Sequence, residues 1–264
     1  MRGVSALLLM SALASASAFA SNGAAVSVKI GGDARWFDWR EFRDGEQLLS
    51  EMGPQVLPAV RTEVALADFF AALDVQYGGG IAYYDGQLQN GTPYTSIAWE
   101  AVLDANWILG WREVRGEVTV GMLQRDWRRF IEGDAQVSSA EERYRWRIAV
   151  IGGEWRVWQS RDWEWRVSAQ FGRPFERKEK VYFATGEDTV TLEPGQGNYV
   201  RIGLPLFPLQ NPTLRIEPYY QQQDLARSEI VPMTQNGVFL GYGVFQPESV
   251  RREVGLALRW NLSL

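Results

Sequence analysis

Apolar and polar residues alternate one by one along most of this chain. The clearest stretch runs from Val254 to Leu264, where every second residue is apolar and the residues between are polar or small. A period of two is typical of a β-strand that has one apolar and one polar environment on its two faces. Similar stretches recur from Val26 onward, so the pattern predicts an all-β chain of about ten strands.

The connections between these stretches are alternately long and short. Long polar connections are expected at about residues 40–57, 85–93, 131–140, 172–197 and 222–248. The connection 172–197 contains two extended stretches of its own, so we interpret it as a hairpin that projects beyond the sheet. Asn236-Gly237 is a strong hairpin-turn dipeptide, and it leaves open an alternative count of twelve strands. An even number of strands places both ends of the chain on one side.

The first twenty residues have a different character. Arg2 precedes an apolar, small-residue stretch over residues 4–16, and Ala18-Phe19-Ala20 has the form of an A-x-A cleavage site. We therefore predict a signal peptide over residues 1–20 and a single mature domain over residues 21–264. No later stretch has the length and apolar character of a membrane-crossing helix.

A closed sheet crosses a membrane without helices. In such a barrel, strands of about ten residues present apolar side chains outward and polar side chains inward, and every backbone group pairs with a neighbour. We predict a transmembrane, antiparallel, up-and-down β-barrel. A soluble periplasmic β-barrel or sandwich is the alternative, but such a fold gives no reason for long and short connections to alternate so regularly.

The end of the sequence resembles the C-terminal assembly signal of Gram-negative outer-membrane β-barrels. Trp260, Leu262 and Leu264 supply its alternating apolar residues, although the commonest last residue of that class is Phe. Residues 83–93 and 125–129 are similar to segments of uncharacterised proteobacterial outer-membrane proteins. The resemblance implies export through the periplasm, an outer-membrane location, contact with outer-membrane lipid and lipopolysaccharide, and insertion by the barrel-assembly machinery. It implies no particular protein partner.

Composition narrows the chemistry. The chain has no Cys and no His, which excludes thiolate and imidazole mechanisms and Cys/His zinc sites. A ten-strand barrel with long outer loops looks like the omptin proteases, but that family relies on a histidine paired with carboxylates. Glu100 and Asp104 share a strand face about 13 Å apart, too far for a coupled pair. We expect no catalytic residue, no metal site and no cofactor.

The charges are numerous and of both signs. There are 27 basic and 32 acidic residues, a net charge of −5, which argues against nucleic acid as a partner. An arginine that faces lipid at the bilayer midplane costs about 2–4 kcal/mol, so we expect the charged strand faces to point into the barrel. The candidate lumen-lining residues are Arg143, Arg145, Arg147, Glu100, Asp104, Glu164, Arg166, Arg215, Glu217 and Arg259.

Three functions remain open for a barrel without catalysis. Ion pairs between the two signs of charge would fill a narrow lumen and give a closed structural barrel. A water-filled lumen would give a narrow channel, which Arg143, Arg145 and Arg147 would bias toward anions. The long outer loops would alternatively serve an adhesin-type, surface-binding protein.

Tryptophans are expected to mark the two membrane interfaces. Trp36, Trp39 and Trp127 lie near the strand ends that lead to long connections. Near the short turns lie Trp107, Trp111, Trp155, Trp158 and Trp163.

Overall fold

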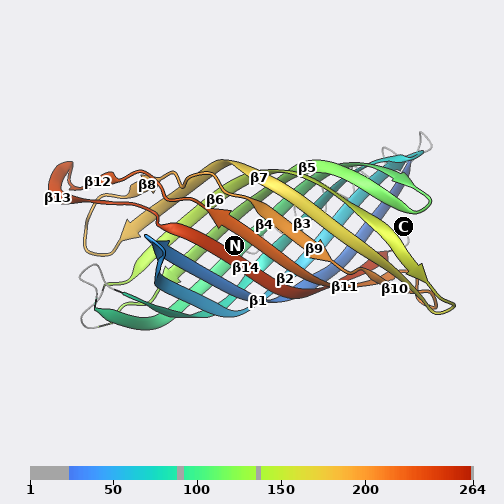
Figure 1. Ribbon diagram of the computed structural model, residues 1–264, viewed down its shortest axis with the longest axis horizontal. Helices are drawn as coiled ribbons and strands as arrows, with labels where there is room; N and C mark the ends of the chain where they lie inside the picture. Colours follow the sequence, from blue (N-terminus) through green and yellow to red (C-terminus); the bar gives the residue numbers. More distant parts are fainter. Residues whose placement is uncertain (1–23, 88–91, 135–137, 263–264) are drawn as a thin grey trace.

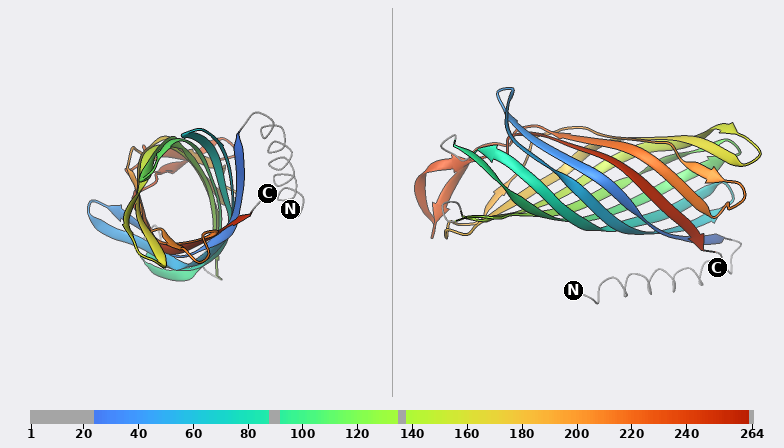
Figure 2. Two further views of the ribbon diagram at one scale, coloured as in Figure 1. Left: turned by 90° about the vertical axis from the view of Figure 1, so that its right-hand side faces the viewer. Right: turned by 90° about the horizontal axis from the view of Figure 1, so that it is seen from below.

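The structure is a computed structural model that describes residues 24–87, 92–134 and 138–262. Its strands close into one antiparallel barrel (Figures 1 and 2). The barrel strands are β1 (Ala25–Arg43), β2 (Glu46–Leu66), β3 (Phe69–Gln87), β4 (Pro93–Glu113), β5 (Gly116–Ile131), β6 (Ala140–Gln159), β7 (Trp163–Phe183), β9 (Tyr199–Gly203) with β10 (Leu206–Pro208), β11 (Leu214–Leu225) and β14 (Glu248–Leu262). No helix of the described residues is long and apolar enough to cross a membrane.

The wall follows the order of the chain. Each strand pairs with the next, and β14 returns to pair with β1 from Val28↔Leu262 to Phe42↔Glu248. The short strands β9 and β10 share one position between β7 and β11. This confirms the predicted up-and-down barrel of ten strands in the described chain. Closure matters in lipid because an open sheet would leave two rows of backbone groups without hydrogen-bond partners.

The two ends of the barrel differ in their connections. The first residues of β1 and the last described residues of β14 pair with each other at one end, which we call the terminal end. Short turns at residues 67–68, 114–115, 160–162 and 209–213 also lie there. The opposite end, the hairpin end, carries the longer connections and one two-residue turn between β1 and β2. The predicted outer-membrane barrel would place the terminal end in the periplasm, because the short turns of bacterial barrels face that side.

The hairpins at the hairpin end are more regular than the sequence pattern predicts. Residues 40–57 are expected to form a loop, whereas β1 and β2 continue through them to a two-residue turn at Asp44-Gly45. Both turn residues have positive φ, 52° and 84°, as a tight hairpin turn requires. Figure 2 shows the blue β1–β2 hairpin projecting beyond its neighbours. Outside the apolar band both faces of a strand can be polar, so the alternation that marks a strand weakens there.

A second small sheet lies beyond the wall. β12 (Val231–Gln235) and β13 (Val238–Val244) pair with each other around Asn236-Gly237 and lie outside the ten-strand wall (Figure 1). The alternative of twelve wall strands is therefore wrong. β8 (Val190–Leu192) pairs with the end of β7 as the predicted projecting hairpin.

β8, β12 and β13 together form what we call the hairpin cap. Its apolar cluster contains Val181, Val190, Leu192 and Met233. Asp188 accepts a hydrogen bond from Thr234 Oγ1 at 2.6 Å and bonds from two backbone N–H groups of the Asn236-Gly237 turn. These hydrogen bonds lower the pKa of Asp188 below its ordinary value, and the bond from Thr234 has the largest effect.

The outer face of the barrel is apolar, with an aromatic belt at its terminal end. Large side chains such as Ile30, Leu109 and Ile151 are 42%, 62% and 56% exposed there. The predicted inner belt is present, because its tryptophans all lie on this face: Trp107, Trp111, Trp155, Trp158 and Trp163. At the hairpin end Trp36 is exposed, but Trp39 and Trp127 are fully buried inside the barrel. The prediction of an interfacial position is therefore wrong for these two.

Deletion of β14 tests the closed wall. Without Glu248–Leu262, the backbone groups of β1 and β11 that now pair with β14 would face lipid unpaired. We expect the truncated chain to lose the faster migration that folded barrels show in unheated SDS gels. A truncated product that folds and stays in solution without detergent would contradict this architecture.

Candidate functional site

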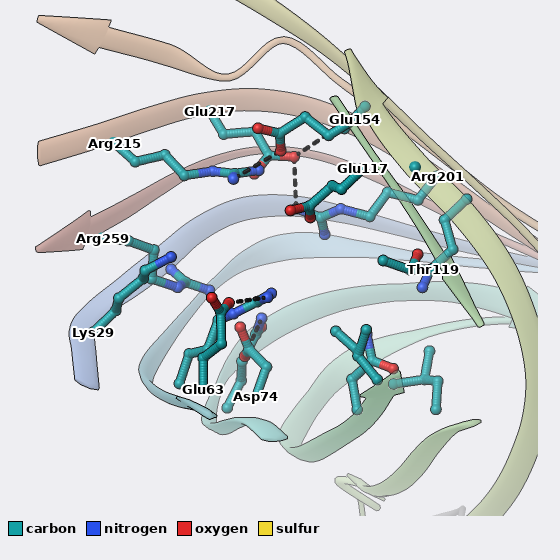
Figure 3. Close-up of a pocket in the computed structure, with 18 of the residues that line it drawn as sticks. Lys29, Glu63, Asp74, Glu117, Thr119, Glu154, Arg201, Arg215, Glu217 and Arg259 are labelled. Carbon is teal, nitrogen blue, oxygen red and sulfur yellow. Dashed lines mark hydrogen bonds and ion pairs between the residues drawn. The ribbon is translucent and has the colours of Figure 1, made fainter. Parts of the chain in front are cut away.

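The interior of the barrel has two parts. Toward the terminal end there is a polar cavity of about 550 Å³ (Figure 3). Toward the hairpin end, large side chains from opposite walls meet and fill the lumen. We call this second part the barrier. Because a passage through the protein must cross both parts, they decide what the lumen can do.

The cavity is strongly charged. Among the described residues that line it, nine are basic and six are acidic, a net charge of +3. Figure 3 shows Lys29, Glu63 and Glu217 projecting into it from three different strands. Arg112 lies at its terminal rim, where its side chain is 41% exposed and its guanidinium carbon is 4.4 Å from the centre of the Phe70 ring. The cavity therefore communicates with solvent at the terminal end.

Shared ion pairs line this cavity. Each of three carboxylates binds two guanidinium groups: Glu63 binds those of Arg61 and Arg112, Glu154 those of Arg166 and Arg215, and Glu217 those of Arg201 and Arg215. Arginine suits this arrangement because its planar fork can reach two carboxylates at once. These three acids of the cavity are thus already engaged by the protein's own cations.

The barrier begins with an ion-pair network around Glu253. Its carboxylate accepts bonds from Arg35 Nη1 at 2.9 Å, Arg251 Nε at 2.6 Å and Arg125 Nη1 at 3.4 Å. Arg125 also makes two 2.7 Å bonds to the carboxylate of Asp104. In the order of the wall, β14 and β5 lie on opposite sides of the barrel, so the Arg125–Glu253 pair spans the lumen.

An aromatic layer lies directly above this network. Trp39 on β1 reaches across the barrel to Trp127 on β5 and Trp146 on β6, with ring centres 5.0 and 6.2 Å apart. Tyr144 stacks on Trp127 at 4.5 Å. All four rings are at most 1% exposed. The guanidinium of Arg251 packs 4.5 Å from the centre of the Trp127 ring and so joins the two layers.

A second ion-pair network closes the barrier on its other side. Arg129 binds Glu142 at 2.6 Å, Glu51 at 2.9 Å and Glu41 at 3.4 Å. Trp127 Nε1 donates a hydrogen bond to Glu100. Arg125, Trp127 and Arg129 are successive inward residues of β5, so this one strand contributes to all three layers.

Most of the predicted lumen-lining residues lie inside the barrel. Glu100 and Asp104 belong to the barrier. Around the cavity lie Glu164, Arg166, Arg215, Glu217 and Arg259. Arg259 Nη1 bonds Asp33 at 2.5 Å.

Three of the predicted lumen-lining residues do not face the lumen, so the prediction is wrong for them. The side chains of Arg143, Arg145 and Arg147 are 52%, 56% and 40% exposed on the outer face of β6. The apolar side chains between and beyond them, Tyr144, Trp146 and Ile148, are instead buried in the lumen.

The error has a physical cause. The prediction assumes that the apolar face of every strand meets lipid, whereas here an apolar face meets the barrier. Glu154, farther along β6, is on the same face as Tyr144 and is buried at the cavity. The alternation of β6 therefore contained a signal for the correct orientation, because an outward Glu154 would face the apolar band.

The assembly-signal residues lie on β14 as far as the structure describes them. Trp260 and Leu262 are 46% and 36% exposed on the outer face. Leu264 and the predicted signal peptide over residues 1–20 fall outside the described residues. Sequence reasoning missed Arg125 and Arg251, whose role depends on what the opposite wall brings within reach. Within the described chain, no cluster of acidic side chains has the form of a metal site.

Comparisons with known proteins concern the fold. No family model matches the sequence, and no curated protein matches it. The crystal structure of the outer membrane protease OmpT from Escherichia coli covers 90% of this chain and 96% of its own, with TM-score 0.50 and 8% identity. Neisserial surface protein A covers 90% of this chain and 99% of its own, with TM-score 0.36 and 9% identity. The Ralstonia pickettii toluene transporter TbuX covers 90% of both chains, with TM-score 0.44 and 9% identity.

The chain therefore shares the β-barrel fold of the outer membrane protease. A shared fold at 8% identity fixes no activity.

Loss of Glu253 should destabilise the barrel severely. In Glu253→Ala, three buried guanidinium groups lose a common carboxylate, and breaking a buried pair in this way costs about 3–5 kcal/mol. The free energy of unfolding, measured with urea in lipid vesicles, reports the loss. Glu248→Ala is the matched control because Glu248 is exposed on the same strand, and we expect a change of at most about 0.5 kcal/mol. Equal effects of the two substitutions would contradict the network.

Proposed function

We propose that the protein is a closed, non-conducting outer-membrane barrel without catalytic activity. The barrier carries this proposal, because Arg125–Glu253 and Trp39–Trp146 connect opposite walls of the lumen. A solute that moves along the barrel axis would have to separate these contacts. The cavity at the terminal end is then a blind vestibule.

The energetics of the barrier support a permanent closure. Opening it would part Glu253 from cations whose side chains are at most 2% exposed, and an uncompensated buried charge costs several kcal/mol. The aromatic rings would lose their mutual packing in the same step. The packing of the aromatic rings and the ion pairs of Glu253 therefore both stabilise the closed state of the barrier.

The chemistry of the interior supports the absence of catalysis. Without His or Cys, the titratable groups of the lumen are carboxylates, guanidinium groups, Lys29 and tyrosine hydroxyls. Glu253, Asp104 and Glu217 each bind arginine. A carboxylate held in this way is a poor proton acceptor.

Planar-bilayer recording tests the closed lumen. We expect no steady conductance from the wild-type protein at any voltage the membrane tolerates. Trp39→Ala combined with Trp127→Ala and Arg125→Ala removes the centre of the aromatic layer and the ion pair with Glu253 that spans the lumen. This variant should produce a measurable conductance, which shows that it has inserted. The control Thr119→Ala alters the cavity wall alone and should remain silent. Steady, anion-selective conductance of the wild type would instead support a channel whose vestibule carries a net charge of +3.

Surface binding is the second candidate function, and the hairpin cap favours it. β13 exposes Val238, Phe239 and Tyr242 to 67%, 59% and 39% beyond the barrel wall. Large apolar side chains gathered at a tip outside the membrane are typical of an interaction surface. The closed lumen and this surface are compatible, since they lie in different parts of the molecule.

An adherence assay tests the second candidate. Cells that produce the wild-type protein should attach to protein-coated surfaces more strongly than cells without it. Val238→Ser combined with Phe239→Ser should abolish this difference at an unchanged amount of folded barrel, because the substitutions lie in an exposed hairpin. Unchanged attachment would remove the support for an adhesin-type role.

A further inference from the structure

Basic residues gather on the outer face of the barrel at one place. Six of them lie on the outward face of β5, β6 and β7 toward the hairpin end: Arg128, Arg143, Arg145, Arg147, Lys178 and Lys180. We call this set the basic patch. Its side chains are exposed, that of Arg128 to 52% and that of Lys178 to 49%.

The register of the strands places like charges directly opposite each other. Arg143 lies between Arg128 on β5 and Lys180 on β7. Arg145 lies opposite Lys178 in the adjacent row. Like charges in directly opposed positions of a sheet are destabilising. The arrangement therefore costs stability wherever no anion neutralises the opposed cations.

The acids within the patch neutralise only part of its charge. Glu141 binds Arg128 at 2.8 Å and Arg143 at 2.5 Å. Asp126 binds Arg145 at 2.7 Å. Glu176 binds Arg147 at 2.8 Å and Lys178 at 3.4 Å. Three acids face six basic residues in this part of the described chain, which leaves a net charge of +3.

The patch begins where the apolar band of the outer face ends. On β5 the outward residues change from apolar to polar after Met122, and on β6 they change between Ala149 and Arg147. On β7 the change lies between Phe171 and Arg173. Arg147 is two residues beyond Ala149, about 7 Å along a tilted strand. With the terminal end in the periplasm, the first row of the patch lies at the depth of the lipid head groups of the outer leaflet, and the other cations lie farther out.

A groove runs through the patch. It has a volume of about 370 Å³ and is lined by cations of the patch, by Asp126, and by Tyr77, Leu103 and Tyr182. Cationic side chains beside aromatic and aliphatic ones suit a ligand that carries both phosphate and hydrocarbon.

We propose that the basic patch binds the phosphate groups of lipopolysaccharide in the outer leaflet. Arg143 and Arg145 provide planar forks for phosphate oxygens, and Lys178 and Lys180 provide mobile point charges. The bound phosphates offset the repulsion between opposed cations, while the acyl chains lie against the apolar band below. This site is on the lipid side of the wall, so it does not depend on whether the lumen conducts.

Binding of purified lipopolysaccharide to the detergent-solubilised full-length protein tests this site. The wild type should bind a fluorescent lipopolysaccharide and lose at least about tenfold in affinity when the lipid A phosphates are removed. The variant Lys178→Gln/Lys180→Gln should show a similar loss. Arg115→Gln/Arg161→Gln is the matched control, because it removes two exposed cations at the terminal end, and it should bind as the wild type does.

Thermal unfolding separates a lost site from a damaged fold. Without lipid, Lys178→Gln/Lys180→Gln should melt at the same or a higher temperature than the wild type, because two like-charge contacts are relieved. Lipopolysaccharide should raise the melting temperature of the wild type but not of this variant. Equal binding of dephosphorylated lipopolysaccharide, or unchanged binding by the variant, would overturn the proposal. Competition by millimolar inorganic phosphate that removes all binding would show a site for free phosphate and would also overturn it.

Discussion

The hydrocarbon of a membrane offers no hydrogen bonds, and this constraint shapes the whole molecule. Because β1 and β14 can satisfy their outer backbone groups only with each other, the sheet must close. Closure with ten strands makes a cylinder so narrow that long side chains from opposite walls meet. Arg125 and Glu253 thereby become contact partners although 128 residues separate them in the chain. The barrier is thus a consequence of closure and of the large residues that point inward.

Charge and aromatic packing support each other in this interior. Buried ions are costly unless they are paired and hydrogen-bonded, and Glu253 meets this condition through three arginines. The rings of Trp127 and Phe37 in turn cover the guanidinium of Arg251, each at 4.5 Å from ring centre to guanidinium carbon. Neither layer would be as favourable alone, since the ion pairs exclude water from the rings and the rings hold the arginines in place.

Sequence reasoning predicts the parts of this structure that repeat along the chain. Alternation and connection lengths predict the strands, their number and the common side of the two ends. They do not predict which face of β6 meets the lumen, because Tyr144 and Trp146 are equally suited to lipid and to a packed interior. The partners of Arg125 also lie beyond such reasoning, since they depend on how the opposite wall is aligned. Glu154 shows that a charge deep in a strand is a better guide to orientation than a row of apolar residues.

Accessibility of a single cysteine in the cavity tests the closed lumen most directly. The chain has no cysteine, so Thr119→Cys provides a unique thiol below the barrier. A membrane-impermeant maleimide should modify this thiol when it reaches the periplasmic side of permeabilised cells, and should leave it unmodified when added to intact cells. Equal modification in intact and permeabilised cells would show an open path through the barrier and would contradict the account.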